Sequence, residues 1–444
     1  MSRALLVDLY ELTMSASYLA EGLDRPATYE LFFRDLPPVR NYLVVGGLER
    51  ALDALEGLQF ADDDLDYLRG LGLFNEAFLA RLGGLRFTGD VWAVPEGEVV
   101  FANEPVVRVT APLIEGQLLE TALLNCYTLA TAVASKASRV ATACAGRPFA
   151  DFSARRDHGP DAALYAARAA FIAGASSTSN VEAGQRFGIP LSGTMAHSYV
   201  LAFPSELDAF RAFTRQFPDA STLLVDTYDV LEGTRRAAEV AGELAASGGS
   251  LGGVRLDSGD LGALSVQVRS ILDAAGLPGV KIVASGDLDE YRIAALLAAG
   301  APIDAFGVGT QLGTSGDAPS LGAVYKLVED VTGPKAKTST GKATRPGVKQ
   351  VYRFGGVGGM LERDLIAPAA ESAPDGGRPL LEPVMAGGRR RAPSPPLAAV
   401  RERYGAAVAA LPARVRSLGP AAPYPVEVSG ALGLGLGLGL GGPA

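Results

Sequence analysis

Glycines and hydroxyl residues follow two apolar stretches in the second half of the chain, where they could bind a phosphate group. SGD at 285–287 follows VKIVA, and GVGT at 307–310 follows DAF. Glycine lets backbone N–H groups approach an anion closely, and a helix beginning just after such a loop favours negative charge. Glycine turns without a ligand have the same composition. Because the two loops occur in succession, they predict that a phosphorylated substrate is bound by Ser285, Gly286, Gly307, Gly309 and Thr310.

A charged pair ends the preceding apolar stretch, GVRLDSGD at 253–260. Arg255 and Asp257 are two residues apart, so in a strand they point to the same side of the sheet. An arginine suits a planar carboxylate through paired hydrogen bonds. A carboxylate beside a phosphate site suits ribose hydroxyls or a magnesium-bound pyrophosphate. A structural ion pair is the alternative interpretation.

Two adjacent arginines, Arg155 and Arg156, follow another predicted strand within DFSARRDHGPD at 151–161. Adjacent residues face different ways. We therefore expect one of them to reach the site and the other to meet solvent or a neighbouring subunit.

The chain has only two histidines, His197 in GTMAHSY and His158 in RRDHGPD. A neutral imidazole is a competent nucleophile toward a phosphoryl group near pH 7. A lone histidine is more often a packed structural residue, so residue type alone leaves the role of His197 open. The sequence has no GxxxxGK[ST] motif, so any ATP used here is not held by a P-loop. It also lacks the nucleophile motifs of serine and cysteine hydrolases.

A repeating strand–loop–helix unit is expected to position these residues. Short apolar runs end at Asp226, Asp257, Ser285 and Gly307, which are 31, 28 and 22 residues apart. Continuous Val, Leu and Ile runs bounded by polar clusters are typical of parallel strands buried on both faces. We therefore predict an α/β fold of βα repeats, with a barrel favoured over an open sheet. The active site is expected at the carboxyl ends of the strands.

The regions that flank the repeats have other patterns. Residues 1–115 mix helical and strand-like stretches and predict an N-terminal α/β domain, which short strands and a helix at about 350–430 complete. The barrel with the active site is assigned to 116–349 and begins with a long apolar helix at 117–143.

Two segments are expected to lack regular structure. Residues 333–350 contain no acid, which predicts either a mobile solvated loop or an anion-binding lid. The end of the chain, 430–444, is rich in Gly and Leu and predicts a disordered tail. The basic residues of the first segment are Lys335, Lys337, Lys342, Arg345 and Lys349.

Composition argues against several classes of protein. The net charge of −9 disfavours a nucleic-acid or anionic-membrane binder. Cys126 and Cys144 form no CxxC pair, so a structural zinc is not expected, and low cysteine use fits a reducing compartment. Asp8 and Glu11 interrupt any apolar core of a signal peptide. Because we find no run of 18 apolar residues, we expect no membrane span.

Seven short motifs, in this order and spacing, resemble those of the nicotinate phosphoribosyltransferase family. They are DLYELTM (8–14), RRDHGPD (155–161), GTMAHSY (193–199), VRLDSGDL (254–261), ASGDLDE (284–290), GVGT (307–310) and PSLGAVYKLVE (319–329). The resemblance covers about residues 5–430. It implies that nicotinate attacks the anomeric carbon of phosphoribosyl pyrophosphate, giving nicotinate mononucleotide and pyrophosphate in NAD biosynthesis. It also implies ATP hydrolysis through a phosphohistidine, as in an ATP-coupled ligase, and Mg²⁺ as cofactor.

The resemblance implies roles for individual residues. His197 matches the phosphorylated histidine. Tyr10 resembles the aromatic residue that stacks on the pyridine ring in the partner subunit's site, and Thr194 and Arg255 resemble contacts to nicotinate. Asp257 is implied near the ribose hydroxyls or the magnesium pyrophosphate. Further substrate contacts are expected from Arg155, Arg156, Ser258, Ser285, Gly286, Gly307, Gly309 and Thr310.

The family resemblance also implies an irregular (β/α) barrel of the phosphoribosyltransferase type and a smaller α/β domain built from both chain ends. A cytoplasmic homodimer with shared active sites is expected. One position departs from the family's arginine motif, because Ser153 stands where a glycine is common. If that position needed a positive φ, the serine would cost about 1 kcal/mol or shift the backbone locally.

Other functions stay open from the sequence. Nicotinamide lacks the charge with which Arg255 would pair, and a site built for a carboxylate should reject it. Enzymes acting on quinolinate are usually much shorter. A degenerate homologue that binds nucleotide and regulates NAD metabolism would be favoured by loss of His197, Asp257 or Thr310, and all three are present.

Overall fold

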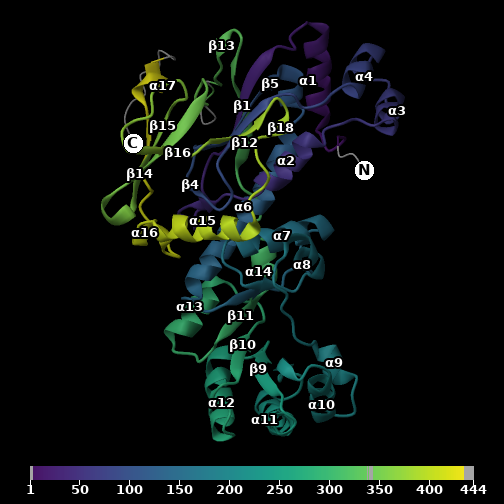
Figure 1. Cartoon of the computed structure of the whole chain (residues 1–444), viewed down its shortest axis with the longest axis vertical. Coiled ribbons are helices and arrows are strands. Elements are labelled where there is room, and N and C mark those ends of the chain that lie inside the picture. The colour runs from purple at the N-terminus through teal and green to yellow at the C-terminus, as the bar shows by residue number, and fades with distance from the viewer. Residues whose placement is uncertain (1–3, 338, 340–343, 435–444) are drawn as a thin grey trace. The chain divides into compact units, whose positions relative to one another are not determined.

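The computed structural model describes residues 4–337, 339 and 344–434 (Figure 1). The chain divides into two compact units. Unit 1 comprises Met1–Ala132 and Ser320–Ala444, and therefore holds both chain ends, whereas unit 2 comprises Val133–Pro319. Unit 2 is shorter at both ends than the segment 116–349 assigned to the barrel. Unit 2 ends before residue 349 because the strand that follows residue 320 pairs with a strand of unit 1.

Unit 2 is built on a curled parallel sheet, a half-barrel. Its strands are β6 (Phe149–Asp151), β7 (Ser177–Thr178), β8 (Asp219–Leu224), β9 (Ser250–Leu256), β10 (Lys281–Ala284) and β11 (Ala305–Val308). They are ordered β7-β6-β11-β10-β9-β8, and every neighbouring pair is parallel. Among the described residues β8 pairs on one side only, and beyond β6 the strand β7 has only an isolated bridge between Thr178 and Leu191, so the sheet does not close as a complete barrel. The predicted strand ends at Asp226, Asp257, Ser285 and Gly307 all lie within two residues of an observed end.

Helices follow the strands of unit 2 and fix where each strand-to-helix loop ends. They are α7 (Pro160–Ile172), α8 (Val181–Phe187), α9 (His197–Leu201), α10 (Glu206–Gln216), α11 (Val230–Ala246), α12 (Leu261–Ala274), α13 (Glu290–Ala298) and α14 (Thr310–Gly313). Asp229, Asp260 and Asp289 cap α11, α12 and α13, each accepting a backbone N–H three residues later. Helix α11 packs on β9 and lies between α10 and α12 (Figure 1).

Unit 1 combines a seven-stranded antiparallel sheet, a four-stranded sheet and a two-stranded pair among the described residues. Strand β12 (Ala323–Asp330) pairs antiparallel with β1 (Pro26–Phe33), and Tyr29 stacks on Tyr325 with ring centroids 4.9 Å apart. The other strands are β2 (Leu43–Val44), β3 (Asp90–Ala93), β4 (Val99–Val100), β5 (Pro105–Pro112), β13 (Gly333–Pro334), β14 (Lys349–Gly355), β15 (Leu361–Pro368), β16 (Gly377–Pro379), β17 (Glu382–Ala386), β18 (Arg389–Arg390) and β19 (Val426–Val428). The helices are α1 (Leu9–Ala20), α2 (Leu48–Glu56), α3 (Asp62–Gly70), α4 (Glu76–Gly83), α5 (Leu113–Gln117), α15 (Leu397–Ala409), α16 (Ala413–Arg416) and α17 (Gly430–Leu434).

The two segments predicted to lack regular structure are partly ordered. Lys349 begins β14, is buried, and places Nζ 2.9 Å from Glu30 Oε2, so a mobile loop is wrong at this residue. Lys342 lies outside the described residues. At the chain end, Gly430–Leu434 forms α17 and Leu432 is buried, which contradicts disorder there. Residues 435–444 lie outside the described part of the chain.

One segment, Leu113–Ala143, is long and apolar enough to cross a membrane by length and composition, contrary to the expectation from the sequence. However, 61% of its most apolar window is buried within the protein. Its longer part is α6 (Glu120–Ala143), which carries Lys136 and Arg139, both buried and paired with the carboxylate of Glu290. These are features of a helix in the core of a folded protein.

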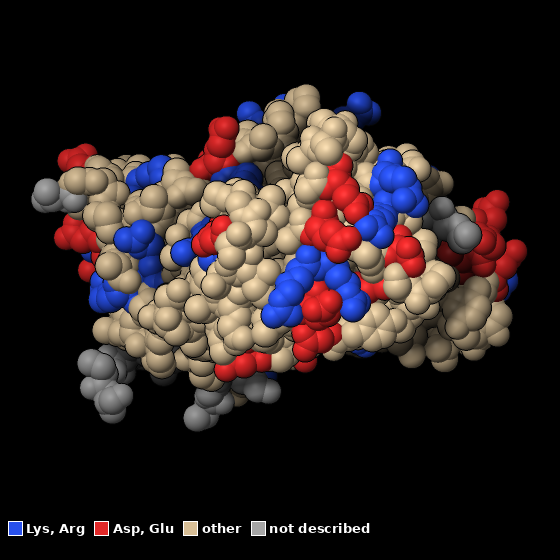
Figure 2. Space-filling model, turned by 90° about the horizontal axis from the view of Figure 1, so that it is seen from below, with Lys and Arg blue, Asp and Glu red and all other residues tan. Residues whose placement is uncertain are grey.

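Acidic and basic side chains are mixed on the surface seen in Figure 2, where no single sign of charge covers the face. Exposed ion pairs such as Arg211–Glu243 and Arg235–Glu232, on α10 and α11, illustrate this mixing. Such pairs contribute little to stability because water screens them.

Candidate active site

The carboxyl ends of β8 and β9 bring a histidine close to two aspartates. His197 is the first residue of α9, and its Nδ1 lies 3.1 Å from Thr227 Oγ1. Its Nε2 lies 3.9 Å from Asp226 Oδ1 and 3.9 Å from Asp257 Oδ2. The side chain of His197 is 42% exposed, so a reactant can approach the ring from solvent.

Arg255, on β9, is held by hydrogen bonds at three of its nitrogens. Its Nε donates to Ser285 Oγ at 2.7 Å, and its Nη2 donates to Asp257 Oδ1 at 2.6 Å. Its Nη1 donates to Thr194 Oγ1 at 2.9 Å and makes a longer contact of 3.4 Å with Met195 O. The side chain of Arg255 is 12% exposed, so it is mostly but not completely withdrawn from water.

Asp257 is ionised at neutral pH. Burial alone would raise the pKa of its carboxyl, but the hydrogen bond from Ser285 and the charges of Arg255 and His197 outweigh burial and hold the pKa below its usual value. Because the folded-state pKa is depressed, the stability that this carboxylate contributes is present above the unfolded-state pKa. It is lost as pH falls through the folded-state value.

Asp226 is the main site residue that sequence reasoning missed. Its Oδ2 accepts from the backbone N–H of Asp257 at 3.1 Å and from Ser258 Oγ at 2.6 Å. Its Oδ1 is buried and has no hydrogen-bond partner in the described part of the chain. The signal was available, because Asp226 ends the apolar run TLLVD as Asp257 ends the next one. Thr227, which contacts His197, carried no comparable signal.

The two glycine loops follow β10 and β11, which are neighbours in the sheet. Gly286 has φ +91°, and a Cβ there would lie 2.0 Å from the carbonyl oxygen of Asp257, so glycine is required. A Cβ at Gly307 would lie 2.5 Å from the ring of Phe152. Gly309 precedes Thr310, the first residue of α14. The loops thus lie at the same edge of the sheet as Asp257.

Arg155 and Arg156 are both exposed, in the turn after β6. The strain considered for Ser153 does not arise, because its φ is not positive. Its hydroxyl donates to Asp157 Oδ2 at 3.0 Å. A Cβ at Gly313 would lie 2.4 Å from the Ser153 Cβ, so that glycine leaves room for the serine.

Two family models together match most of the chain. Residues 5–128 match the nicotinate phosphoribosyltransferase (NAPRTase) N-terminal domain, and residues 148–342 match the NAPRTase family. The chain belongs to the nicotinate phosphoribosyltransferase family.

Relatives and solved structures agree with this membership. A nicotinate phosphoribosyltransferase of Mycobacterium tuberculosis is 50% identical over 428 residues, covering 96% of this chain and 91% of the relative. One from Bacillus subtilis is 47% identical over 361 residues, covering 80% and 73%. The crystal structure of human nicotinic acid phosphoribosyltransferase matches with a TM-score of 0.86 at 30% identity, covering 96% of this chain and 98% of the human one. The predicted fold class is therefore confirmed.

Tyr10, predicted to stack on a ligand in a partner subunit, belongs to unit 1 of this family member. It lies on α1 and is 45% exposed. Partial burial and the nearby carboxylates of Glu120 and Glu11 raise the pKa of its hydroxyl, so the side chain stays protonated. Its contact with nicotinate stays a prediction.

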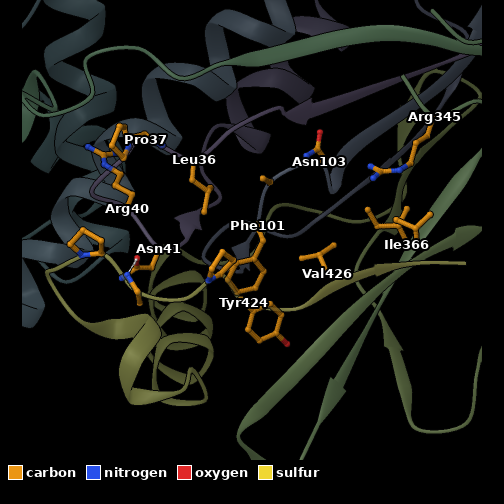
Figure 3. Close-up of a pocket in the computed structure, with 16 residues that line it drawn as sticks. Leu36, Pro37, Arg40, Asn41, Phe101, Asn103, Arg345, Ile366, Tyr424 and Val426 are labelled. Atoms are coloured by element: carbon orange, nitrogen blue, oxygen red, sulfur yellow. Dashed lines mark hydrogen bonds between the residues drawn. The ribbon is translucent and has the colours of Figure 1, made fainter. Parts of the chain in front are cut away.

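A cavity of about 410 Å³ lies in unit 1, lined by none of the predicted site residues (Figure 3). Phe101 and Tyr424 stack with ring centroids 4.0 Å apart in its wall, and Arg345 from the basic segment also lines it. Burial lowers the pKa of Arg345. The cavity has no histidine or carboxylate in its lining, so the chemistry is assigned to the strand ends of unit 2.

Proposed function

We propose that the chain is a nicotinate phosphoribosyltransferase that transfers phosphoribose to nicotinate in NAD biosynthesis and couples this transfer to ATP through phosphorylation of His197. The observation that carries the proposal is the cluster of His197, Asp226, Asp257 and Arg255 at the strand ends, beside two glycine loops.

Arg255 is proposed to bind the carboxylate of nicotinate. Its Nε and Nη2 are engaged by short hydrogen bonds, whereas the 3.4 Å contact from Nη1 to Met195 O is the longest and easiest to displace. A carboxylate reaching Nη1 and the remaining Nη2 proton would gain a charge-assisted pair of hydrogen bonds. Nicotinamide would leave that buried guanidinium edge unpaired, which disfavours it as a substrate.

The transfer itself needs charge stabilisation and positioning rather than a base. The pyridine nitrogen already has a lone pair, and pyrophosphate leaves an oxocarbenium-like anomeric carbon. Backbone N–H groups of the loops at Gly286 and Gly309 are proposed to hold the 5′-phosphate. Asp257, which is ionised, is proposed to bind the ribose hydroxyls or the magnesium ion of the pyrophosphate.

A magnesium ion fits the residues present. Mg²⁺ is commonly bound by one or two carboxylates together with substrate phosphates, and Asp226 offers a buried oxygen without a hydrogen-bond partner. No group of three or more metal-ligating side chains occurs among the described residues, so substrate oxygens and water would complete the coordination. The ion would supply positive charge beside the pyrophosphate.

The same geometry supports the proposed phosphorylation of His197. If Nδ1 donates its proton to Thr227 Oγ1, Nε2 keeps a lone pair and can attack the γ-phosphorus of ATP. The Nε2–P bond forms as the bond to the bridging oxygen breaks and ADP leaves. Water later cleaves the Nε2–P bond and releases phosphate.

A homodimer in the cytoplasm is part of the proposal. Leu5, Leu6, Leu9 and Tyr10 are exposed by 38–53% at the start of unit 1, which supports burial against another copy of the chain. Cys126 and Cys144 form no disulfide bond, which fits a reducing compartment.

The test is a product assay with purified protein, phosphoribosyl pyrophosphate and Mg²⁺. Nicotinate, nicotinamide and quinolinate are each supplied with and without ATP. Mononucleotide from nicotinate, increased by ATP and accompanied by ADP, is the expected result. Turnover of nicotinamide instead would contradict the role of Arg255, and binding without turnover of any substrate would favour a regulatory protein.

A further inference from the structure

A buried lysine in the second half of α6 joins two segments that follow the glycine loops. Lys136 Nζ lies 2.5 Å from Glu290 Oε2 and 3.0 Å from Asp317 Oδ1. The side chain of Lys136 is 2% exposed, that of Glu290 0% and that of Asp317 13%. A lysine so fully withdrawn from water is rare unless both its charge and its hydrogen bonds are met.

The first partner continues the loop after β10. Glu290 is the first residue of α13, four positions after Gly286. Arg139, one turn after Lys136 on α6, donates from Nε to Glu290 Oε1 at 2.8 Å and from Nη2 to the Tyr291 hydroxyl at 2.7 Å. The first turn of α13 is therefore fixed to α6 at two successive residues.

The second partner continues the loop after β11. Asp317 lies four residues beyond the end of α14, the short helix that Thr310 begins. The turn between them is tight, because Ser315 has φ +48° and its hydroxyl donates to Ala318 O at 2.8 Å. An ion pair to Asp317 thus holds the segment that follows Gly309 and Thr310.

The four charged groups balance one another. Lys136 and Arg139 are cationic, and Glu290 and Asp317 are anionic, so the cluster is closed rather than open to a ligand. His197, Arg255 and Asp257 make their hydrogen bonds with other residues of unit 2, among them Thr227, Thr194 and Ser285. A role in the reaction would therefore be exerted through the position of the loops.

We infer that Lys136 is a positioning residue for phosphoribosyl pyrophosphate, because it fixes the spacing between the two loops proposed to bind the 5′-phosphate. This inference rests on the proposed function. Backbone N–H groups bind an anion well only when they converge on it, and a displacement of about 1 Å can cost about 100-fold in rate. The nicotinate site is expected to depend less on this spacing, because Arg255 contacts only the first loop, through Ser285, and is also held by Thr194 and Asp257.

The experiment compares two buried lysines that each pair with a buried glutamate. Lys136→Met removes the charge at similar length, and Lys349→Met does the same in unit 1, where Lys349 is 2.9 Å from Glu30. Both variants are expected to lower the melting temperature. Only Lys136→Met is expected to raise the KM for phosphoribosyl pyrophosphate, by about tenfold, with the KM for nicotinate within about twofold of wild type.

Equal KM values for phosphoribosyl pyrophosphate in the two variants would overturn the inference and leave Lys136 a purely structural residue. If Lys136→Met does not fold, Asp317→Asn replaces it, since this variant keeps the Lys136–Glu290 pair, and an increase of about threefold in the same KM is expected. A change below about 1.5-fold would overturn the inference in that case.

The proposed function is tested separately, with the wild-type protein. If wild type forms no nicotinate mononucleotide, that function fails. The inference about Lys136 is then tested by the Kd of phosphoribosyl pyrophosphate, measured by calorimetry in wild type and in Lys136→Met. A weaker Kd supports loop positioning, and an unchanged Kd overturns it.

Discussion

Each unit contains a buried arginine paired with an aspartate, and the two pairs differ in how accessible they are to a ligand. In unit 1, Arg353 is 1% exposed and donates to Asp364 through Nε and Nη2 and to Glu98 through Nη1. Burial works against its charge, but Asp364, Glu104 and Glu98 outweigh burial and raise the pKa of Arg353. This guanidinium is therefore paired with carboxylates and almost excluded from water.

The arginine of unit 2 is less deeply buried, at 12% exposed, although it too makes hydrogen bonds at three nitrogens. His197, near Asp257, is 42% exposed, and Asp226 has one oxygen without a hydrogen-bond partner among the described residues. Burial and perturbed charge therefore do not mark an active site by themselves. Access to solvent at the carboxyl ends of parallel strands distinguishes the two clusters, because Glu104, near Arg353, also has an oxygen without a hydrogen-bond partner among the described residues.

The largest expected effect on activity comes from Arg255→Met. Removing the guanidinium should lower kcat/KM for nicotinate by about 10²–10³-fold, because a charge-assisted contact is lost in a site with little water. Steady-state kinetics measure this, with circular dichroism as a check of folding. Wild-type kinetics in Arg255→Met would contradict the conclusion that the Arg255 cluster, unlike the Arg353 cluster, serves the reaction.

His197→Ala should remove the stimulation by ATP while a slow, ATP-independent transfer remains. The reason is that no other histidine lies in the cluster, and His158 is elsewhere, in the exposed turn before α7. The ratio of rates with and without ATP measures this and should fall to about one. Retained stimulation would refute the phosphohistidine.

Arg353→Met tests the other half of the comparison. It leaves the carboxylates of Asp364 and Glu98 without their main cation, which should lower the free energy of unfolding by about 3–5 kcal/mol. Chemical denaturation measures this loss. The KM values should stay at wild type below the melting temperature, and a large change in KM would show that the closed cluster also serves the reaction.

The smallest effect is expected from Glu104→Gln. Burial and the neighbouring Asp364 raise the pKa of Glu104 well above its usual value, which favours the protonated form of its carboxyl. A raised folded-state pKa stabilises the fold below the unfolded-state value of 4.5, and this stability is lost as pH rises through the folded-state value.

At pH 5 the free energies of unfolding of Glu104→Gln and wild type should therefore differ by no more than about 1 kcal/mol. As pH rises, the variant should become more stable relative to wild type. Denaturation curves at pH 5 and pH 8 measure the difference. A constant difference would mean that Glu104 is ionised. Glu104→Gln should leave activity unchanged. Asp257 differs from Glu104 because its pKa is lowered rather than raised.

The sequence predicts the sheet of unit 2 well because its signals are local. Apolar runs followed by Asp226, Asp257 and Ser285 are sufficient to place three strand ends. Strand β12 pairs with β1, which lies nearly 300 residues earlier, and no local sequence pattern indicates this pairing. The predicted barrel boundary at 349 was therefore too late in the chain.

Residues that act through distant partners were the hardest to predict. Thr227 and Lys136 are ordinary residues in the sequence and gain a role only from what folding places beside them. Lys349 gives the opposite lesson, because a basic run suggested a solvated loop whereas Glu30, 319 residues away, neutralises its charge.

The close approach of Gly286 to the carbonyl oxygen of Asp257 also limits which substitutions the protein can tolerate during evolution. Any larger residue at 286 would push the β10 loop away from β9 and would separate the phosphate loop from Asp257 in a single step. A library of variants selected for growth on nicotinate should therefore lose every substitution at 286. Gly193, where an added Cβ would meet no atom within 4 Å, should accept alanine and serine. New ring specificities are thus more accessible through the loop before His197 than through the loop that follows β10.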